Sequence, residues 1–455
     1  MRKVLCCAIG LSLLTAATAF AGGYRVTVQS PDMTAKAGAN IASASGADVA
    51  YTNPAGAAWV QNGWLAQVDM TYIYLGSARY DDARTGDPRY GGINFSGNST
   101  EGHFFLPTAF VLSPNWNGLR IGFSCVTPYG LTFRWNDKYP NMYNHKFALQ
   151  ISEFNPTATY AITDKFSVAG GARLVYATAT VINVVDKSMG PVALGQNADA
   201  SRGMNGMTTE WGYNLAADFK PTKEMNLAVT FRSRVDLDFT GDVILRGQMY
   251  NQALPGGYVF GNPYGPYPNV LSELRTRGSV STPVPAVLAF SGSYDFGKTT
   301  VELTIDRTYW SALKDIQFKM NGADAHGNPN TGNPILDGFA AHGSYKTMDW
   351  QDSWSVRLGL EYEATKALTL MAGLAYDESP VRDYSVGFEL PDSDSWVFSI
   401  GARYAFTNNL EAGLGVLFDK KMTNVVRASD NNPQVNGRFS DMLGIVVSAG
   451  VQYKF

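Results

Sequence analysis

Residues 354–376 read WSVRLGLEYEATKALTLMAGLAY. Every second residue is apolar from Trp354 to Tyr362 and again from Leu368 to Tyr376, with a short polar turn between the two runs. A two-residue period predicts two β-strands that form a hairpin. The apolar faces begin or end in aromatic side chains, and the opposite faces carry small, polar or singly charged residues. This distribution is typical of strands with lipid on one side and a water-filled lumen on the other.

The same pattern recurs along the chain and predicts an all-β fold, a fourteen-stranded antiparallel transmembrane β-barrel. The strands are expected at residues 64–78, 103–113, 118–128, 146–162, 164–184, 207–220, 224–244, 273–295, 299–320, 352–363, 367–378, 394–406, 409–426 and 438–455. Short turns, such as 163–164, 220–222 and 407–409, are expected at the periplasmic end. Long polar insertions at 185–206, 245–272 and 321–350 are expected at the extracellular end.

Composition supports this class of fold. A length of 455 residues would ordinarily indicate about two or three domains, but one closed sheet can include many hairpins. The formal net charge of −3 gives no reason to expect binding to nucleic acid. Beyond residue 21 there is no run of about 18 apolar residues, so no transmembrane helix is expected. Strands embedded in a bilayer must then close into a barrel, because lipid tolerates no open sheet edge.

The N-terminus carries a processing signal. A basic start, an apolar run over residues 4–17 and the small-x-small tripeptide 19–21 predict a signal peptide, residues 1–21, that is cleaved after Ala21. Cys125 is then the single cysteine of the mature chain, so no internal disulfide is expected.

Residues 22–63 differ from the rest of the chain, because small residues dominate and no alternation persists. The lumen of a fourteen-stranded barrel is too wide to be filled by side chains of the wall. We therefore expect residues 22–63 to form a small N-terminal hatch (plug) inside a barrel of residues 64–455. A disordered N-terminal tail is the alternative.

The last expected strand ends in Phe455. A terminal aromatic residue on such a strand resembles the signal that the barrel-assembly machinery reads. The sequence therefore predicts a bacterial outer-membrane protein that meets outer-membrane lipid, lipopolysaccharide and the barrel-assembly machinery.

Six short motifs follow one another along the chain: NPAG (53–56), TPYGL (127–131), FNPTATY (154–160), YWS (309–311), AYDESPV (375–381) and LPDSDSW (390–396). With the run W-x-V-R-L-G-L-E-Y that opens at Trp354, they resemble the FadL family of outer-membrane transporters for long-chain fatty acids and other hydrophobic compounds. The resemblance covers essentially the whole mature chain. It implies a monomeric, passive channel with no cofactor, in which a hatch plugs the barrel and a kinked third strand leaves a gap for lateral release.

The residues of the third strand allow such a kink independently. Pro128 lacks the N–H that a sheet needs, and Gly130 favours a bulge or break two positions later. In the alternative interpretation the strand simply ends at Thr127 and turns. The resemblance implies that Asn53, Pro54 and Ala55 contact the kink from the hatch.

Substrate-binding positions follow from the resemblance. A hydroxyl position near the kink falls on Thr127, which keeps the hydroxyl. The two positions that carry basic residues in fatty-acid transporters fall on Thr178 and Gln351, so both basic groups are absent. Arg173 and Arg357 face the lumen by alternation and are candidates to replace them. The alternative is that both arginines are wall charges facing Glu361 or Glu411.

Magnitudes show how much these basic groups matter. Burial of a fatty chain yields roughly 0.8 kcal/mol per CH₂, or on the order of 10 kcal/mol for a sixteen-carbon tail before entropic losses. A partly solvated ion pair adds about 1 kcal/mol. An apolar pocket therefore supplies the affinity, and loss of the basic pair favours neutral hydrophobes such as alkylbenzenes or alkanes as the alternative substrates.

Neither catalysis nor a metal site is expected. The histidines form no Ser-His-acid order, and three loop aspartates are interpreted as solvated charges rather than Ca²⁺ ligands. These residues are His103, His145, His326, His342, Asp324, Asp337 and Asp349. The aromatic stretch 258–267 is expected either to capture ligand or to lie against lipopolysaccharide. A general diffusion porin is a further alternative, against which the hatch argues.

Overall fold

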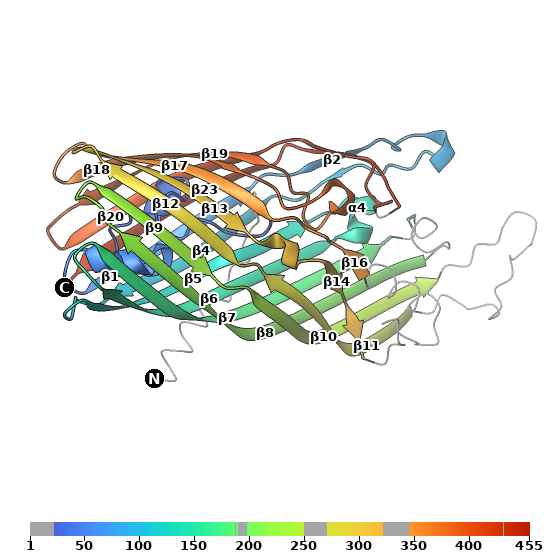
Figure 1. The fold of residues 1–455 in the computed structure, drawn as a ribbon. Helices are drawn as coiled ribbons and strands as arrows, with labels where there is room; N and C mark the ends of the chain where they lie inside the picture. The colour runs from blue at the N-terminus through green and yellow to red at the C-terminus, as the bar shows by residue number, and fades with distance from the viewer. Residues whose placement is uncertain (1–21, 187, 190–197, 250–270, 322–344, 431) are drawn as a thin grey trace, which may run out of the picture.

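The computed structural model describes residues 22–186, 188–189, 198–249, 271–321, 345–430 and 432–455. The main sheet of this part of the chain contains 17 strand segments. In three places two segments continue one another, so the wall formed by the described residues has 14 strands. Figure 1 shows these strands tilted around a closed barrel.

β1 pairs with β4 on one side and with β23 on the other, which closes the barrel. All neighbouring wall strands are antiparallel, so the predicted fourteen-stranded barrel is confirmed. The wall segments are β1 (Leu65–Leu75), β4 (Gly102–Leu112), β5 (Leu119–Arg134), β6 (Lys146–Ala161), β7 (Phe166–Val185), β8 (Ala198–Phe219), β9 and β10 (Met225–Arg232, Val235–Met249), β11 and β12 (Leu271–Val284, Val287–Asp295), β13 and β15 (Thr299–Thr308, Lys319–Met320), β17 (Ser353–Glu363), β18 (Leu368–Asp377), β19 (Ser395–Ala405), β20 (Leu410–Lys421) and β23 (Leu443–Lys454).

Some strands differ from their predicted form. The strand expected at 273–295 is divided near Pro285, which has no N–H to donate. The strand expected at 299–320 leaves the wall after β13 and forms η3 (Trp310–Ala312) and β14 (Asp315–Gln317), which pairs with β16 (Tyr345–Thr347). The third strand, β5, continues beyond Pro128 to Arg134, so the alternative in which it ends at Thr127 is wrong.

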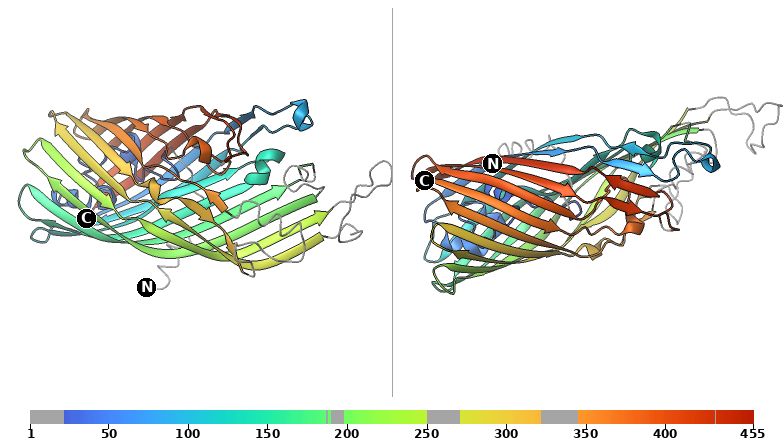
Figure 2. Two further views of the ribbon diagram at one scale, coloured as in Figure 1. Left: turned by 45° about the vertical axis from the view of Figure 1, so that its right-hand side comes forward. Right: turned by 90° about the horizontal axis from the view of Figure 1, so that it is seen from above.

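A second, 4-stranded sheet extends beyond the wall. Figures 1 and 2 show it at the end of the barrel away from the C-terminus. Its strands are β2 (Arg79–Asp82), β3 (Gly97–Asn98), β21 (Asn424–Val426) and β22 (Gly437–Ser440), and the nearby helices are η2 (Pro88–Tyr90), α4 (Lys138–Tyr143) and η4 (Asp383–Ser385). Among the described residues, no helix is both long enough and apolar enough to cross a membrane.

The two faces of the wall are those that the alternation predicts. In β17 the apolar residues Trp354, Val356 and Leu358 are exposed on the outside, whereas Ser355 and Arg357 are buried on the inside. A soluble protein would bury the apolar set. The outward position of these side chains is stabilised by lipid instead.

Residues 22–63, called the N-terminal segment below, lie inside the barrel. Figure 1 shows the helices of this segment, in blue, within the wall near the end that holds the C-terminus. They are α2 (Pro31–Ala35), α3 (Val49–Thr52) and η1 (Pro54–Trp59). Most residues of the segment are buried, so a disordered tail is not what the structure shows. Small side chains at these positions permit backbone to pack closely against the wall.

Candidate functional site

The wall is incomplete between β4 and β5. These strands pair only where Ala109–Leu112 meet Gly122–Cys125, although β4 begins earlier and β5 ends later. β5 instead remains paired with β6 as far as Arg134. At the far end the two edges approach again, because Thr100 N donates to Arg134 O at 2.8 Å. The resulting opening, called the β4–β5 gap below, is bordered by residues 102–108 of β4 and 126–133 of β5.

A β-bulge marks the place where β5 leaves β4. The register between β5 and β6 shifts between Val126 and Tyr129, where β5 contains an additional residue. Pro128 lies in this bulge and donates no backbone hydrogen bond. The bulge in β5 therefore lies at Pro128, close to Gly130, as the missing N–H of proline predicts.

The start of the N-terminal segment supplies the hydrogen bonds that β4 does not. Val26 N donates to Pro128 O at 2.8 Å, and Gly130 N donates to Tyr24 O at 2.9 Å. Arg25 forms an isolated antiparallel bridge with Tyr129. Residues 24–26 thus act as a short strand along the β5 side of the β4–β5 gap.

Gln29 connects the two sides of this gap. Its side chain donates to Thr127 O at 3.1 Å and accepts from Thr127 N at 3.0 Å. Its backbone carbonyl accepts from Thr108 Oγ1 of β4 at 2.9 Å. One residue of the N-terminal segment therefore holds both borders of the opening.

The NPA motif, which the family resemblance places against the kink, makes its hydrogen bonds to other strands. Asn53 Nδ2 donates to Asp218 of β8 at 2.6 Å. The carbonyl of Pro54 accepts from Thr159 of β6, and the carbonyl of Ala55 accepts from Ser167 of β7. Their hydrogen bonds are thus to β6, β7 and β8, whereas residues 24–29 contact the kink. Sequence reasoning missed the latter, although YRVTVQ at 24–29 alternates as a short strand does.

Both candidate arginines face the lumen, and both are neutralised there. Arg357 is 2% exposed and donates to Asp377 at 2.6 Å and to Asp306 at 3.2 Å. Arg173 is 1% exposed and donates to Glu153 at 2.9 Å. Their carboxylate partners are therefore not Glu361 or Glu411, as the alternative interpretation had it. The partners are carboxylates of the adjacent strands β13, β18 and β6, which the register of the sheet brings beside the arginines.

Asp306 also binds Arg25, whose Nη1 lies 2.5 Å from the carboxylate. Arg232 shares Glu153 with Arg173 and lies over the ring of Tyr51. The pair of Arg25 with Asp306 ties the N-terminal segment to the wall, and each of these arginines already has an anionic partner.

The other candidate positions are not brought together. Thr127 is buried at the β4–β5 gap, where its backbone forms hydrogen bonds with the side chain of Gln29. Thr178 does not join the luminal set: its neighbour Ala177 is fully buried, and Thr178 is cross-strand from the exposed Met207. An inward Ala177 places Thr178 on the outer face, because side chains alternate along a strand. Gln351 precedes β17, and its N donates to Pro380 O at 3.0 Å.

An apolar interior lies on the inner side of the β4–β5 gap. Tyr24 packs edge-on against Trp310 with ring centroids 4.6 Å apart, and Trp350 lies 5.1 Å from Trp310. Further buried residues of the same cluster are Tyr129, Leu131, Trp135, Tyr139, Leu149, Ile151, Val175, Leu237, Phe239, Phe388, Leu390 and Phe439. Contact with these apolar side chains would stabilise a bound hydrophobic ligand, because its apolar surface would be removed from water.

A cavity of about 170 Å³ lies at the gap itself. It is lined by the end of β1, the first residues of β4 and the last of β5. Phe104, which lines the cavity, is buried.

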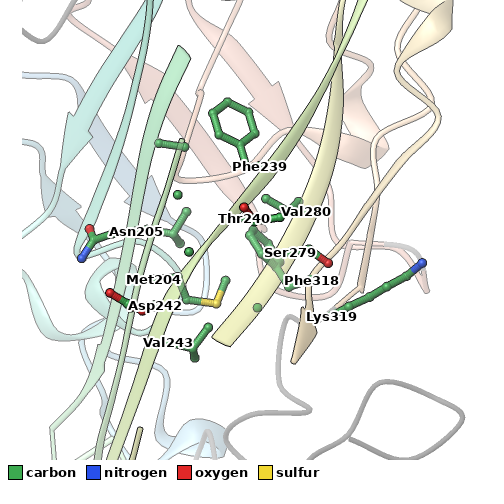
Figure 3. Close-up of a pocket in the computed structure, with 15 residues that line it drawn as sticks. Met204, Asn205, Phe239, Thr240, Asp242, Val243, Ser279, Val280, Phe318 and Lys319 are labelled. Carbon is green, nitrogen blue, oxygen red and sulfur yellow. The ribbon is translucent and has the colours of Figure 1, made fainter. Parts of the chain in front are cut away.

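Two other cavities differ in character. One of about 490 Å³ is lined by residues 41–45 of the N-terminal segment and by charged wall residues such as Lys220, Glu363 and Arg403. The other, of about 30 Å³, is shown in Figure 3, where Met204, Phe239 and Phe318 surround it between β8, β10, β11 and β15. The aromatic stretch 258–267 lies outside the described residues.

Charged groups fix the rest of the N-terminal segment. Lys36 forms an ion pair with Glu361 of β17, and Glu302 of β13 accepts from the backbone N–H groups of Ile41 and Ser43 at 2.7 and 2.8 Å. Asp48 accepts from Ser30 at 2.6 Å. Burial, and after it the nearby charge of Asp32, raises the pKa of the Asp48 carboxyl to about 6.

No group of three or more His, Cys, Asp or Glu in the described ranges could hold a metal ion. His326, His342, Asp324 and Asp337 lie outside these ranges. What the site offers is shape and apolar surface.

Comparison with known proteins places the chain in a family. The family model described as outer membrane protein transport protein (OMPP1/FadL/TodX) matches residues 12–455. The long-chain fatty acid transport protein of Escherichia coli O6:H1 is 25% identical over 353 residues, which cover 72% of this chain and 73% of that protein. The 47 kDa outer membrane protein of Pasteurella multocida is 26% identical over 341 residues, covering 70% and 71% of the two chains.

Solved structures have the same fold. The crystal structure of a Pseudomonas aeruginosa FadL homologue has a TM-score of 0.75 at 20% identity and covers 95% of this chain and 100% of that one. The Pseudomonas putida toluene transporter TodX has a TM-score of 0.65 at 15% identity, with 90% and 94% covered. At these identities the likeness establishes the fold alone.

Proposed function

Because the chain belongs to the OMPP1/FadL/TodX family of outer membrane transport proteins, we propose that it is a passive channel that takes up long-chain fatty acids or related hydrophobic compounds. The ligand enters the apolar interior and leaves sideways through the β4–β5 gap into the outer membrane. The single observation that carries this proposal is the gap itself, which has an apolar, aromatic interior on one side and membrane on the other.

The route needs movement of the N-terminal segment. Residues 24–26 and Gln29 occupy the gap, so the ligand passes when these residues release Thr127, Pro128 and Gly130. The bonds to be released are a few backbone and amide hydrogen bonds, each worth about 0.5–1.5 kcal/mol net. Binding of a long apolar chain supplies more than this. No chemical step or energy source is required, and we assign the chain no catalytic role.

The remaining segment acts as the hatch. The backbone groups of residues 41–43 and 54–55 are anchored to β13, β6 and β7, so the body of the segment stays in the lumen while its first residues move. We propose that the signal peptide ends at Ala21, that the hatch spans 22–63 and that the chain works as a monomer in outer-membrane lipid and lipopolysaccharide after insertion by the barrel-assembly machinery.

Neutral hydrocarbons are a second substrate class, and one observation favours them. Three luminal arginines, Arg25, Arg173 and Arg357, are all paired with carboxylates. A fatty-acid carboxylate would have to compete with a protein carboxylate for each of them. Relatives carry both classes by name: the E. coli relative is a long-chain fatty acid transport protein, and the TodX structure is that of a toluene transporter.

Uptake by cells tests the proposal. Cells without their own transporter of this kind would be given labelled palmitate or labelled decylbenzene, with and without this chain in the outer membrane. Expression of the chain should accelerate uptake of at least one of the two, and no acceleration of either would contradict the proposal. Deletion of residues 22–63 separates it from a porin: a hatched barrel becomes conductive to ions, whereas an open porin keeps its conductance unchanged.

A further inference from the structure

Two buried hydrogen-bond donors in the apolar interior have no protein partner. Trp310 is 0% exposed and Trp350 is 2% exposed. Neither indole N–H finds an acceptor within the part of the chain that the structure describes. A buried, unsatisfied donor costs about 1–3 kcal/mol, so two of them in one cluster call for an explanation.

The two indoles belong to one aromatic cluster at the mouth of the gap. Their ring centroids are 5.1 Å apart, and the ring of Tyr24 lies 4.6 Å from Trp310 and 5.9 Å from Trp350. The hydroxyl of Tyr24 is already used, because it donates to Pro283 O at 2.7 Å. The two N–H groups are thus donors without a described acceptor in mainly aromatic surroundings, in which Asp392 accepts from Gly23 N at 3.2 Å and is paired with Lys421.

The position of Trp310 connects it with the movable residues. A Cβ on Gly23 would lie 2.7 Å from Cζ2 and 3.0 Å from Cε2 of Trp310, which is the edge beside the indole nitrogen. Gly23 and Tyr24 therefore cover this edge. Tyr24 also accepts the hydrogen bond from Gly130, so release of the gap and exposure of the indole edge involve the same residues.

The chemistry of the donors restricts what they can bind. An indole N–H donates and never accepts, so its partner must be an acceptor. The arginines Arg25 and Arg357 are already engaged in ion pairs, because both bind Asp306 and Arg357 also binds Asp377. A carboxylate buried here would have no counter-ion of its own and would pay a large desolvation cost. An uncharged oxygen acceptor pays far less.

We propose that Trp310 and Trp350 bind the polar end of the ligand and that this end is an uncharged carbonyl oxygen, as in a long-chain ketone or ester. The inference rests on the proposed function, since it concerns the ligand of the same channel. The indole donors orient the polar end at the gap, and the apolar tail lies along the aromatic interior.

Matched ligands test this assignment. Decanophenone and decylbenzene differ by one carbonyl oxygen in place of two hydrogens, and both are neutral. Binding of each would be measured to the purified full chain in nanodiscs. The unaltered protein should bind decanophenone more tightly by about threefold to tenfold, the size of one net hydrogen bond. Trp310→Phe and Trp350→Phe should remove that preference and leave the affinity for decylbenzene within about twofold.

Two controls keep the result interpretable. Trp354→Phe changes a tryptophan that is 45% exposed on the outer face of β17, and it should keep the preference of the unaltered protein. In the unaltered protein with ¹⁵N-labelled tryptophan, decanophenone should move two indole N–H resonances downfield, whereas decylbenzene should not. This second measurement does not depend on how the variants fold.

If the Phe variants lost affinity for both ligands equally, the two tryptophans would have only a packing role, and the assignment would be overturned. An unchanged ketone preference in those variants, or indole resonances that do not respond to decanophenone, would overturn it as well. If neither ligand binds the unaltered protein, the assignment fails, whereas the proposed function fails only if uptake of labelled palmitate is not accelerated either.

Discussion

Gln29 is the residue on which closure of the gap depends most directly. Its amide both donates to and accepts from the backbone of Thr127, and it also donates to Val26 O at 2.9 Å. These bonds are buried, where each lost partner leaves an unsatisfied group. The β5 border of the gap is therefore held by a side chain rather than by a neighbouring strand.

Replacing Gln29 by alanine should loosen this border. Without the amide, the N–H of Thr127 loses its acceptor, and its hydrogen exchange should accelerate roughly tenfold or more. Gln29→Glu is the matched variant, because it keeps an acceptor for Thr127 N and removes the donor. Hydrogen exchange of peptides that contain Thr127, measured by mass spectrometry, should be faster in Gln29→Ala than in Gln29→Glu or in the unaltered protein. Equal exchange in Gln29→Ala and the unaltered protein would show that the gap is held by other contacts.

Asp48 makes the N-terminal segment sensitive to pH. Its carboxylate accepts from Ser30 and from Asn40 at 2.6 and 2.9 Å, and Asp32, Lys36 and Arg403 are the charged groups around it. Its pKa is raised from 3.8 to about 6 in the folded protein. The folded state then binds a proton more tightly than the unfolded state does. The stability that this group contributes is present in full below about pH 4 and is lost as pH rises through about 6.

We therefore expect the segment to be held about 1 kcal/mol more tightly at pH 5 than at pH 7.5. Asp48→Asn cannot ionise and should remove most of this difference. Hydrogen exchange of residues 30–48, corrected for the intrinsic effect of pH on exchange, measures it. The same pH difference in Asp48→Asn as in the unaltered protein would assign the effect to another group.

At the scale of elements, α2 lies against glycines of three adjacent strands. A Cβ on Gly373 of β18 would be 2.5 Å from Ala37 N, and a Cβ on Gly415 of β20 would be 2.5 Å from Pro31 O. Gly401 of β19 lies between them and faces Ala35. Backbone atoms cannot move aside as a flexible side chain can. The absence of side chains in the wall is thus what allows the helix to lie there.

A single methyl group should disturb this packing. Gly373→Ala is expected to displace the end of α2 at a cost of about 1–3 kcal/mol and to raise ionic conductance in planar bilayers. Gly203→Ala in β8 is the control, because no atom lies within 4 Å of its added Cβ. If the two variants conduct alike, contact with the wall does not position α2.

The wall strands were predictable from the sequence, but the places where the chain leaves the wall were predictable only in part. Alternation alone gives the exposed and buried faces of β17, because that signal is local to the strand. The interruption after β13 was missed, since Trp310 leaves the wall to reach Tyr24, which is far away in sequence. The bulge at Pro128 was predictable, because proline has no backbone N–H to donate to a neighbouring strand.

The candidate site was predictable only in part for the same reason. Arg357 and Arg173 face the lumen by parity, but their partners Asp377 and Glu153 depend on which strands adjoin and in what register. Thr178 was placed by motif comparison, and a shift of one residue turns a side chain to the opposite face. Pairing of Tyr24 with Gly130 joins two regions between which sequence gives no periodic signal.

For the whole molecule, the arrangement separates polar and apolar functions along the barrel. Near the end with the C-terminus, the segment of residues 22–63 fills the lumen with buried ion pairs such as that of Lys36 with Glu361. Beyond it lies the aromatic interior, and the β4–β5 gap joins this interior to the outside of the wall. We propose that the first part excludes water and ions and that the second gives a hydrophobe a lateral exit.

The central claim is that the ligand leaves through the β4–β5 gap, and deletion of Pro128 tests it most directly. β5 has one residue too many between Val126 and Tyr129, so removal of Pro128 restores its regular register with β6 and allows β5 to approach β4. Uptake of labelled decylbenzene or palmitate would be measured in cells that carry equal amounts of the two proteins, each checked for a folded barrel. The account predicts that the deletion lowers uptake about tenfold or more. Uptake that continues at the original rate through a folded, regular wall would contradict it.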